Sequence, residues 1–273
     1  MINKHISTQS HELLNHFIRS GRDCFDFTEA LSVLPASNVN AVKELLSDMV
    51  RRGLLMRLNK GLYYLIPYEK DAESFMPDWH LVAGHLARGA KHYIGYYSAL
   101  QIHNPITQPS LKEQIVVSQQ FRPSVVTIKA VDFQFIYHNE NHFFGYQDTW
   151  IDSFHKVSCS DLEKTLIDCL FRPDYAGGIG EIARALYQSK GMIKFDKLLD
   201  YAQRFNSQAV IKRLGFLLEL MGIESQIIEN LRQIKTASYV LLDTELPKDG
   251  KLISRWSIQQ NLESETITSA LYT

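Results

Sequence analysis

Apolar residues recur three and four positions apart from Ser37 to Arg52, the spacing of one buried face of a helix. They are Val39, Val42, Leu45, Leu46, Met49 and Val50. We expect Ser37 to cap the first turn, and Arg51 and Arg52 to suit the negative C-terminal end of the helix dipole. Gly53 supplies the left-handed residue that commonly ends such a helix. The pattern predicts one amphipathic helix between Ser37 and Gly53.

A hairpin is predicted directly after this helix. Two apolar segments, Leu54–Leu58 and Leu62–Ile66, lie on either side of Asn59-Lys60-Gly61. That connection places glycine where a three-residue hairpin loop needs a positive φ. Pro67 then ends the second strand.

Upstream, residues 10–20 carry apolar side chains on one helical face, and Cys24–Phe27 looks extended. Thr28 is expected to cap a short helix that ends before Pro35. Helix, short strand, helix, turn, helix and hairpin is the order of a winged helix-turn-helix domain. We place that domain at residues 1–70.

The rest of the chain predicts a linker and a larger domain. Residues 71–90 are polar at first and then helical from Trp79 to Ala87, so we interpret them as a linker helix. Within 91–273, short β-rich segments between Gln114 and Val157, spaced about ten residues apart, favour an antiparallel sheet. A helical bundle follows, opened by a capping box at Ser160–Glu163. The expected fold class is α+β, with a mixed α/β C-terminal domain.

Charge and cysteine usage narrow the function classes. The net charge is −1, so any nucleic-acid site must be a local basic patch. Four cations lie between Arg51 and Lys60 with no acidic residue among them. Three cysteines without a Cys-x-x-Cys pair speak against a disulfide framework and a zinc ribbon. With no signal-peptide core and no long apolar run, we expect a cytoplasmic protein that does not enter a membrane.

Three places suggest chemistry, and each has a simpler interpretation. His138 and His142 flank a carboxylate in a predicted hairpin turn, where exposed loop histidines are favoured over a metal site. Gly177–Gly180 precedes a helix without the Lys-Ser/Thr of a phosphate loop, so a helix lead-in is favoured. Capping and dipole compensation account for the carboxylates of Asp161 and Glu163. We therefore expect no catalysis, no cofactor and no metal.

The candidate DNA-binding residues lie at the start of the predicted long helix and on the hairpin. They are Ser37, Asn38, Asn40, Ala41, Lys43, Arg57, Asn59 and Lys60. Lys43, Arg57 and Lys60 are expected to contact phosphates, which position a protein on duplex DNA. Asn38 and Asn40 are expected to reach base edges, because an asparagine amide can pair with adenine through two hydrogen bonds.

Several stretches in this order resemble the AbiEi-type antitoxins of type IV toxin-antitoxin and abortive-infection systems. They are Asn59–Tyr64, Tyr93–Leu100, Ser160–Asp168 with Gly177 and Gly178 after it, and more weakly Arg213–Glu219. The resemblance implies an N-terminal winged helix that represses its own operon, and a C-terminal domain that counters a neighbouring nucleotidyltransferase toxin. It also implies a structural role for Lys164, Thr165, Asp168, Gly177 and Gly178. The chain departs from the family at Asn38 and Asn40, where a more basic helix start is typical.

Two hypotheses from different classes follow. The first is a DNA-binding transcriptional autorepressor that acts as an antitoxin, with double-stranded operator DNA and the toxin as partners and direct contact with the toxin left open. The second is a protein-interaction module whose winged helix no longer binds DNA. Basic residues on the hairpin favour the first, and the near-neutral net charge allows the second.

Overall fold

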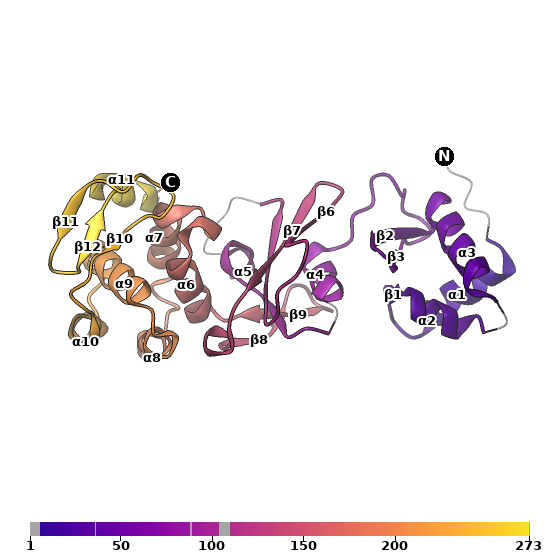
Figure 1. The fold of residues 1–273 in the computed structure, drawn as a ribbon, viewed down its shortest axis with the longest axis horizontal. Coiled ribbons are helices and arrows are strands. Elements are labelled where there is room, and N and C mark those ends of the chain that lie inside the picture. Colours follow the sequence, from indigo (N-terminus) through magenta and orange to yellow (C-terminus); the bar gives the residue numbers. More distant parts are fainter. Residues whose placement is uncertain (1–5, 36, 88, 104–109, 273) are drawn as a thin grey trace. The chain divides into compact units, whose positions relative to one another are not determined.

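The computed structural model describes residues 6–35, 37–87, 89–103 and 110–272. The chain divides into two compact units, Met1–Leu86 and Ala87–Thr273, and this division falls within the expected 71–90 linker. Eleven α-helices and three sheets are formed by the described residues, so the fold is α+β (Figure 1).

The first unit combines helices with a small antiparallel sheet. Its elements are α1 (Thr8–Arg19), β1 (Cys24–Asp26), α2 (Phe27–Val33), α3 (Val39–Arg51), β2 (Leu55–Asn59), β3 (Leu62–Leu65) and most of α4 (Trp79–Ala87). The strand order is β1-β3-β2, with β2 and β3 forming the expected hairpin. Leu13, Phe17, Val42, Leu46 and Met49 are all fully or almost fully buried in one core. The apolar stripe of α3 therefore packs as its spacing predicts.

Two predicted helix caps in the first unit are wrong, one by a single position and the other by two. Asn38, not Ser37, caps α3, because it is the extended residue directly before the first helical residue and its Oδ1 accepts the Ala41 N–H at 2.8 Å. Asp26, not Thr28, caps α2. Its carboxylate accepts from the Glu29 N–H while the Glu29 carboxylate accepts from the Asp26 N–H, which satisfies two backbone donors at once.

The second unit begins with a six-stranded sheet, ordered β6-β7-β5-β4-β9-β8. Its elements are β4 (His92–Ile94), α5 (Tyr96–Ile102), β5 (Lys112–Val117), β6 (Val125–Ile128), β7 (Val131–Tyr137), η1 (Glu140–His142), β8 (Tyr146–Trp150) and β9 (Lys156–Ser160). The prediction of an antiparallel sheet is wrong. The sheet is mixed, because β5 pairs with β7, and β4 with β9, in parallel. The hairpin partner β6 lies at the edge, so β7 can pair with β5 on its other side.

Helices and a second small sheet complete this unit. They are α6 (Leu162–Phe171), η2 (Pro173–Tyr175), α7 (Gly178–Ser189), α8 (Phe195–Phe205), α9 (Gln208–Leu220), α10 (Ile227–Ile234), β10 (Val240–Leu241), β11 (Lys251–Ile253), β12 (Ile258–Gln260), α11 (Ser264–Ser269) and η3 (Ala270–Tyr272). The cap of α6 is Asp161, whose side chain accepts from the Lys164 N–H, and not Ser160 as expected. The strand β12 and the helix α11 were not predicted. Trp256 packs on α9 at Gly215, where a methyl group would meet the indole at 2.1 Å.

Candidate nucleic-acid interface

The start of α3 presents polar side chains outward because its apolar stripe is held in the core. Val42, Leu46 and Met49 are fully buried, which fixes the rotation of the helix about its axis. Asn40, Ala41 and Lys43 therefore lie on the exposed side of its first turns, as does Asn38 before them. Because the backbone N–H groups also point out of this end, the start of α3 favours negative charge.

The hairpin presents three more of the candidate residues. Gly61 has φ +68°, the left-handed conformation that the connection needs. The Asn59 Oδ1 accepts the Lys60 N–H at 2.7 Å and so fixes the tip. Arg57, Asn59 and Lys60 are all exposed. The hairpin thus carries two cations outward from a hydrogen-bonded turn.

One hollow in the first unit brings the predicted phosphate-contacting residues together. Lys43 from α3 and Arg57 and Lys60 from the hairpin line a cavity of about 360 Å³. Its other lining residues are Phe27, Ser47, Val50, Gly61 and Tyr63. The Lys43 Nζ lies 6.0 Å from the centre of the Phe27 ring. Three cations from two elements therefore face one concave surface.

The structure changes the expected role of four other residues. Arg51 and Arg52 both pair with the carboxylate of Asp48, one turn earlier in α3. Two of the four cations between Arg51 and Lys60 are therefore paired with an acidic side chain. Ser37 is half-buried and accepts a hydrogen bond from the Gln9 Nε2 at 3.1 Å. The Oδ1 of Asn38 accepts the Ala41 N–H in the helix cap, and a two-bond contact with adenine would need the same oxygen.

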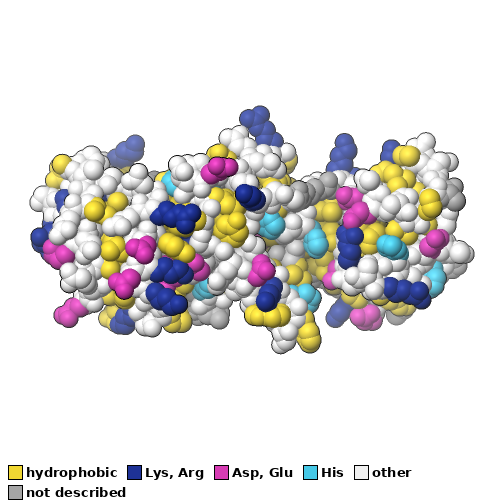
Figure 2. All heavy atoms as spheres, turned by 90° about the horizontal axis from the view of Figure 1, so that it is seen from below, with side chains coloured by type: hydrophobic (Ala, Val, Ile, Leu, Met, Phe, Trp, Pro, Cys, Tyr) yellow, Lys and Arg dark blue, Asp and Glu magenta, His cyan; other side chains and the backbone are white. Residues whose placement is uncertain are grey.

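Charged residues of both signs are distributed over the chain as a whole. On the face of the molecule in Figure 2, lysine and arginine side chains lie among acidic ones. This matches the net charge of −1. Clustered cations are accordingly a local feature, as in the hollow on the first unit.

A second polar cluster lies inside the second unit. The side chains of Lys164 and Asp168 are fully buried and form an ion pair along α6. The Tyr93 hydroxyl donates to the Asp168 Oδ2 at 3.0 Å and accepts from the Lys164 Nζ at 2.9 Å. The His138 Nδ1 lies 3.3 Å from the same hydroxyl, and its Nε2 lies 2.7 Å from the Tyr96 hydroxyl.

One tautomer of His138 satisfies this whole cluster. Because the only hydroxyl proton of Tyr93 goes to Asp168, the Nδ1 of His138 must donate to the Tyr93 oxygen. Its Nε2 then accepts from Tyr96, so the ring is neutral. Burial lowers the pKa of His138 to about 4, which agrees with a neutral ring at pH 7. Burial also lowers the pKa of Lys164 and, together with Asp168, raises the pKa of Tyr93 and Tyr96.

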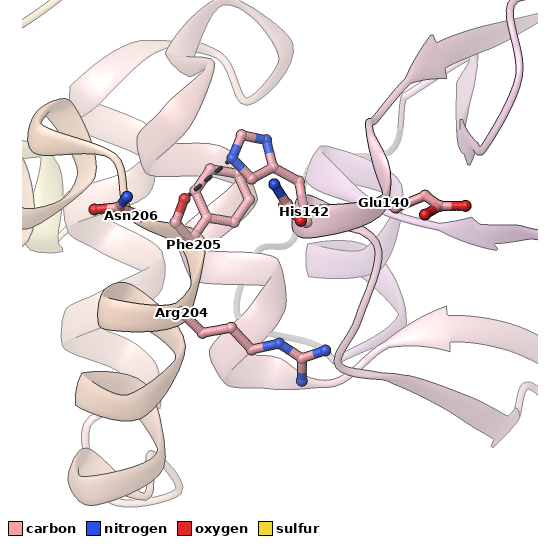
Figure 3. Close-up of a pocket in the computed structure, with 6 residues that line it drawn as sticks. Glu140, His142, Arg204, Phe205 and Asn206 are labelled. Carbon is pink, nitrogen blue, oxygen red and sulfur yellow. Dashed lines mark hydrogen bonds between the residues drawn. The ribbon is translucent and has the colours of Figure 1, made fainter.

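The expectation of exposed loop histidines is therefore wrong. His138 is 3% exposed, and the His142 ring stacks on the Phe205 ring with their centres 3.7 Å apart. Figure 3 shows this ring pair beside a pocket of about 340 Å³, with Arg204 alongside and Glu140 pointing away from the rings. Among the described residues, no group of three or more His, Cys, Asp or Glu side chains is placed to hold a metal ion.

The glycines at the start of α7 are also explained by protein contacts. Gly177 and Gly178 have φ values of +75° and +84°, as a left-handed entry into a helix requires. The Asp243 Oδ2 accepts the Ile179 N–H at 2.9 Å. A carboxylate of the chain itself thus lies at the helix N-terminus that a phosphate could otherwise use. This supports a helix lead-in over a phosphate loop.

The buried histidine predicts how stability depends on pH. Unfolded His138 takes up its proton near pH 6.5, whereas the folded ring stays neutral down to about pH 4. Its contribution is therefore complete above pH 6.5 and is lost as the pH falls toward 4, by about 3 kcal/mol. Urea unfolding of the second unit at several pH values measures this loss. His138→Gln should flatten the dependence in that window, and an equal slope in both proteins would contradict a buried neutral ring.

Comparisons with known proteins show the fold alone. No family model matches the chain, and no curated protein matches it. Among solved structures, it is similar to the crystal structure of RV2827C protein from Mycobacterium tuberculosis, with a TM-score of 0.72 and 14% sequence identity. That match covers 100% of this chain and 97% of the other chain. The class defined by fold is thus an α+β protein whose architecture is shared with the mycobacterial protein.

Proposed function

We propose that residues 1–70 form a winged helix-turn-helix domain that binds duplex DNA through α3 and the β2–β3 hairpin. The observation that carries this proposal is the convergence of Lys43, Arg57 and Lys60 on one hollow. A helix start and a hairpin tip 17 residues apart in sequence, from Lys43 to Lys60, supply cations to the same surface. When the helix lies in a groove of the duplex, cations arranged in this way can contact the phosphates on both sides of that groove.

The wider proposal follows from the sequence resemblance to AbiEi-type antitoxins. In it, the chain represses its own operon and counters a nucleotidyltransferase toxin encoded beside it, with no catalysis of its own. Ser37, Ala41 and Asn59 would support the contacts with the DNA backbone, and Asn40 would read a base edge. Asn38 would reach a base edge only in competition with its capping bond to the Ala41 N–H. We place this activity in the cytoplasm. In the part of the chain that the structure describes, no helix is both long and apolar enough to span a membrane.

Binding to the promoter DNA upstream of its own gene tests the first proposal. We expect the full-length chain to shift this DNA in a mobility-shift assay, with a binding constant that falls steeply as salt rises. Lys60→Ala should lower the slope of log K against log salt by roughly one, because one phosphate contact is lost. Lys248→Ala is the matched control, since it removes one exposed lysine from the second unit. It should leave the slope unchanged.

The same assay separates the two classes of function. A full-length, folded protein that shifts no promoter DNA at low salt would favour the alternative, a protein-interaction module with a winged helix that does not bind DNA. Equal slopes for the chain and for its Lys43→Ala, Arg57→Ala and Lys60→Ala variants would remove the hollow from the DNA interface.

A further inference from the structure

The strand β8 presents an unpaired edge of the large sheet. It is the last strand in the order β6-β7-β5-β4-β9-β8 and pairs with β9 in regular antiparallel register from Tyr146 to Trp150 (Figure 1). The Gly145 carbonyl accepts from Asp161 N–H, and the Ile151 N–H donates to the His155 carbonyl. Because hydrogen-bonded positions alternate along an antiparallel pair, the odd-numbered residues bond to β9.

The even-numbered residues therefore turn their backbone groups away from β9. These are Tyr146, Asp148 and Trp150, and in the described parts of the chain no strand pairs with this side of β8. Their N–H and C=O groups form a row with the spacing that an added strand would use. The edge is thus a preformed template for another extended segment.

Two of the other edge strands, β6 and β2, carry features that discourage such pairing. The opposite edge strand, β6, is four residues long and lies between Pro123 and Lys129. In the first unit, β2 has an irregular register between Arg57 and Asn59. Proline, lysine and bulges are the usual means by which proteins protect sheet edges. The strand β8 has none of the three.

Exposed aromatic side chains accompany this edge. Trp150 is 58% exposed, and Phe154 in the turn after β8 is 84% exposed. Tyr146 is held in place by stacking on Tyr93, with ring centres 5.2 Å apart. The Lys156 Nζ lies 4.4 Å from the centre of the Trp150 ring. One face of the edge therefore shows two aromatic residues with the exposed carboxylate of Asp148 between them.

The carboxylate of Asp148 determines which kind of strand can pair with this edge. A second copy of this chain that used all three outward residues would pair antiparallel about a twofold axis through Asp148, which would oppose Asp148 to itself. Directly opposed like charges destabilise a strand pair. Sliding the copies by two residues to avoid this contact leaves only two of the three outward residues paired. A cationic segment avoids both problems.

We propose that β8 binds an extended segment of a different protein as an added antiparallel strand, with a lysine or arginine opposite Asp148. Apolar side chains of that segment would lie opposite Tyr146 and Trp150. Its backbone supplies hydrogen bonds to the row of outward groups, and the cation fixes its register. This interaction surface lies wholly on the second unit and does not depend on DNA binding by the first.

Labelled peptides test the proposal on the full-length chain. The probe is a fluorescein-labelled peptide, Gly-Ser-Val-Thr-Lys-Thr-Val-Ser-Gly, whose binding is followed by fluorescence polarisation. We expect saturable binding, about fivefold weaker for a peptide with glutamate in place of lysine. N-methylation of the lysine and second valine amides should abolish binding, because it removes donors to the edge.

Variants of the chain complete the experiment. Asp148→Lys should reverse the preference, so that the glutamate peptide binds better than the lysine peptide. Gln147→Lys is the positional control, since it introduces the same lysine side chain one residue away on the opposite face of the sheet, with a charge change of one unit instead of two, and it should keep the original preference. Circular dichroism confirms that each variant is folded.

Four results would overturn this assignment. They are no saturable binding at millimolar peptide, equal binding of the N-methylated peptide, a peptide preference that Asp148→Lys leaves unchanged, and a dimer of this chain that Asp148→Pro dissociates. The last would make a second copy the occupant, because proline at that position removes the outward N–H that a paired copy would use and leaves the bonds of the odd-numbered residues to β9 in place.

Discussion

Replacing Asp168 with leucine is expected to lower the free energy of unfolding of the second unit by about 3–5 kcal/mol. The side chain of Lys164 is fully buried and pairs with this carboxylate. Without Asp168, its ammonium would lose its charged partner and keep the Tyr93 hydroxyl and the faces of the surrounding aromatic rings. A buried charge without its partner is costly, because its removal from water is no longer compensated.

Removing both charges should recover most of that loss. The double variant Lys164→Met/Asp168→Leu replaces a buried ion pair by apolar side chains of similar size, which is often neutral or stabilising. Urea unfolding of the two single variants and the double variant gives the coupling energy. Glu229→Leu is the matched control, because its pair with Arg232 lies on the surface of α10 and should change stability by less than about 1 kcal/mol. A double variant as unstable as Asp168→Leu would contradict the charge argument.

The burial of Lys164 and Asp168 could not be predicted from the sequence pattern alone. The periodicity of Leu166 and its neighbours predicted α6, because an apolar stripe fixes a helix and its buried side. It could not predict that Lys164 and Asp168 also face the core, since their partners Tyr93 and His138 come from strand segments far away in sequence. The i, i+4 spacing of an oppositely charged pair was the only local signal.

The sheet illustrates the same limit. Strand segments and turns were predictable from local composition, but the parallel pairs β5–β7 and β4–β9 depend on which neighbour each strand takes. Turn chemistry fixes only the contacts between consecutive strands, such as β6–β7. Pairing between strands that are not consecutive depends on how the whole sheet is buried against its helices. A short window of sequence carries no information about that burial.

In the candidate DNA site, the exposure of the three cations follows from the sequence pattern more directly than the role of the asparagines does. Lys43, Arg57 and Lys60 came from the ends of a helix and a hairpin whose apolar faces dictate their exposure. The role of Asn38 depends on where α3 begins, because the observed cap lies one residue after the expected cap, Ser37. The pairing of Arg51 and Arg52 with Asp48 had a visible signal in the spacing of three and four residues.

Loss of DNA binding should leave protection from the toxin intact, if the two proposed functions reside in separate units. Arg57→Glu/Lys60→Glu reverses two exposed charges on the hairpin, so the fold should persist while the promoter shift is lost. When this variant is expressed from an independent promoter, we expect cells that produce the neighbouring toxin to grow as they do with the unaltered chain. The measurement is growth on co-expression, with the level of the chain followed by immunoblot.

Leu166→Asp should have the opposite outcome. Leu166 is fully buried in α6, so a carboxylate there faces desolvation without a partner and costs several kcal/mol, enough to unfold a marginally stable unit. Rescue from the toxin should be lost, whereas Leu166→Met, which conserves volume and polarity, should retain it. If the hairpin variant fails to rescue at a normal protein level, the first unit itself restrains the toxin and the proposed division between the units is wrong. If Leu166→Asp still rescues, the folded second unit is not what opposes the toxin, because its core cannot accommodate that charge.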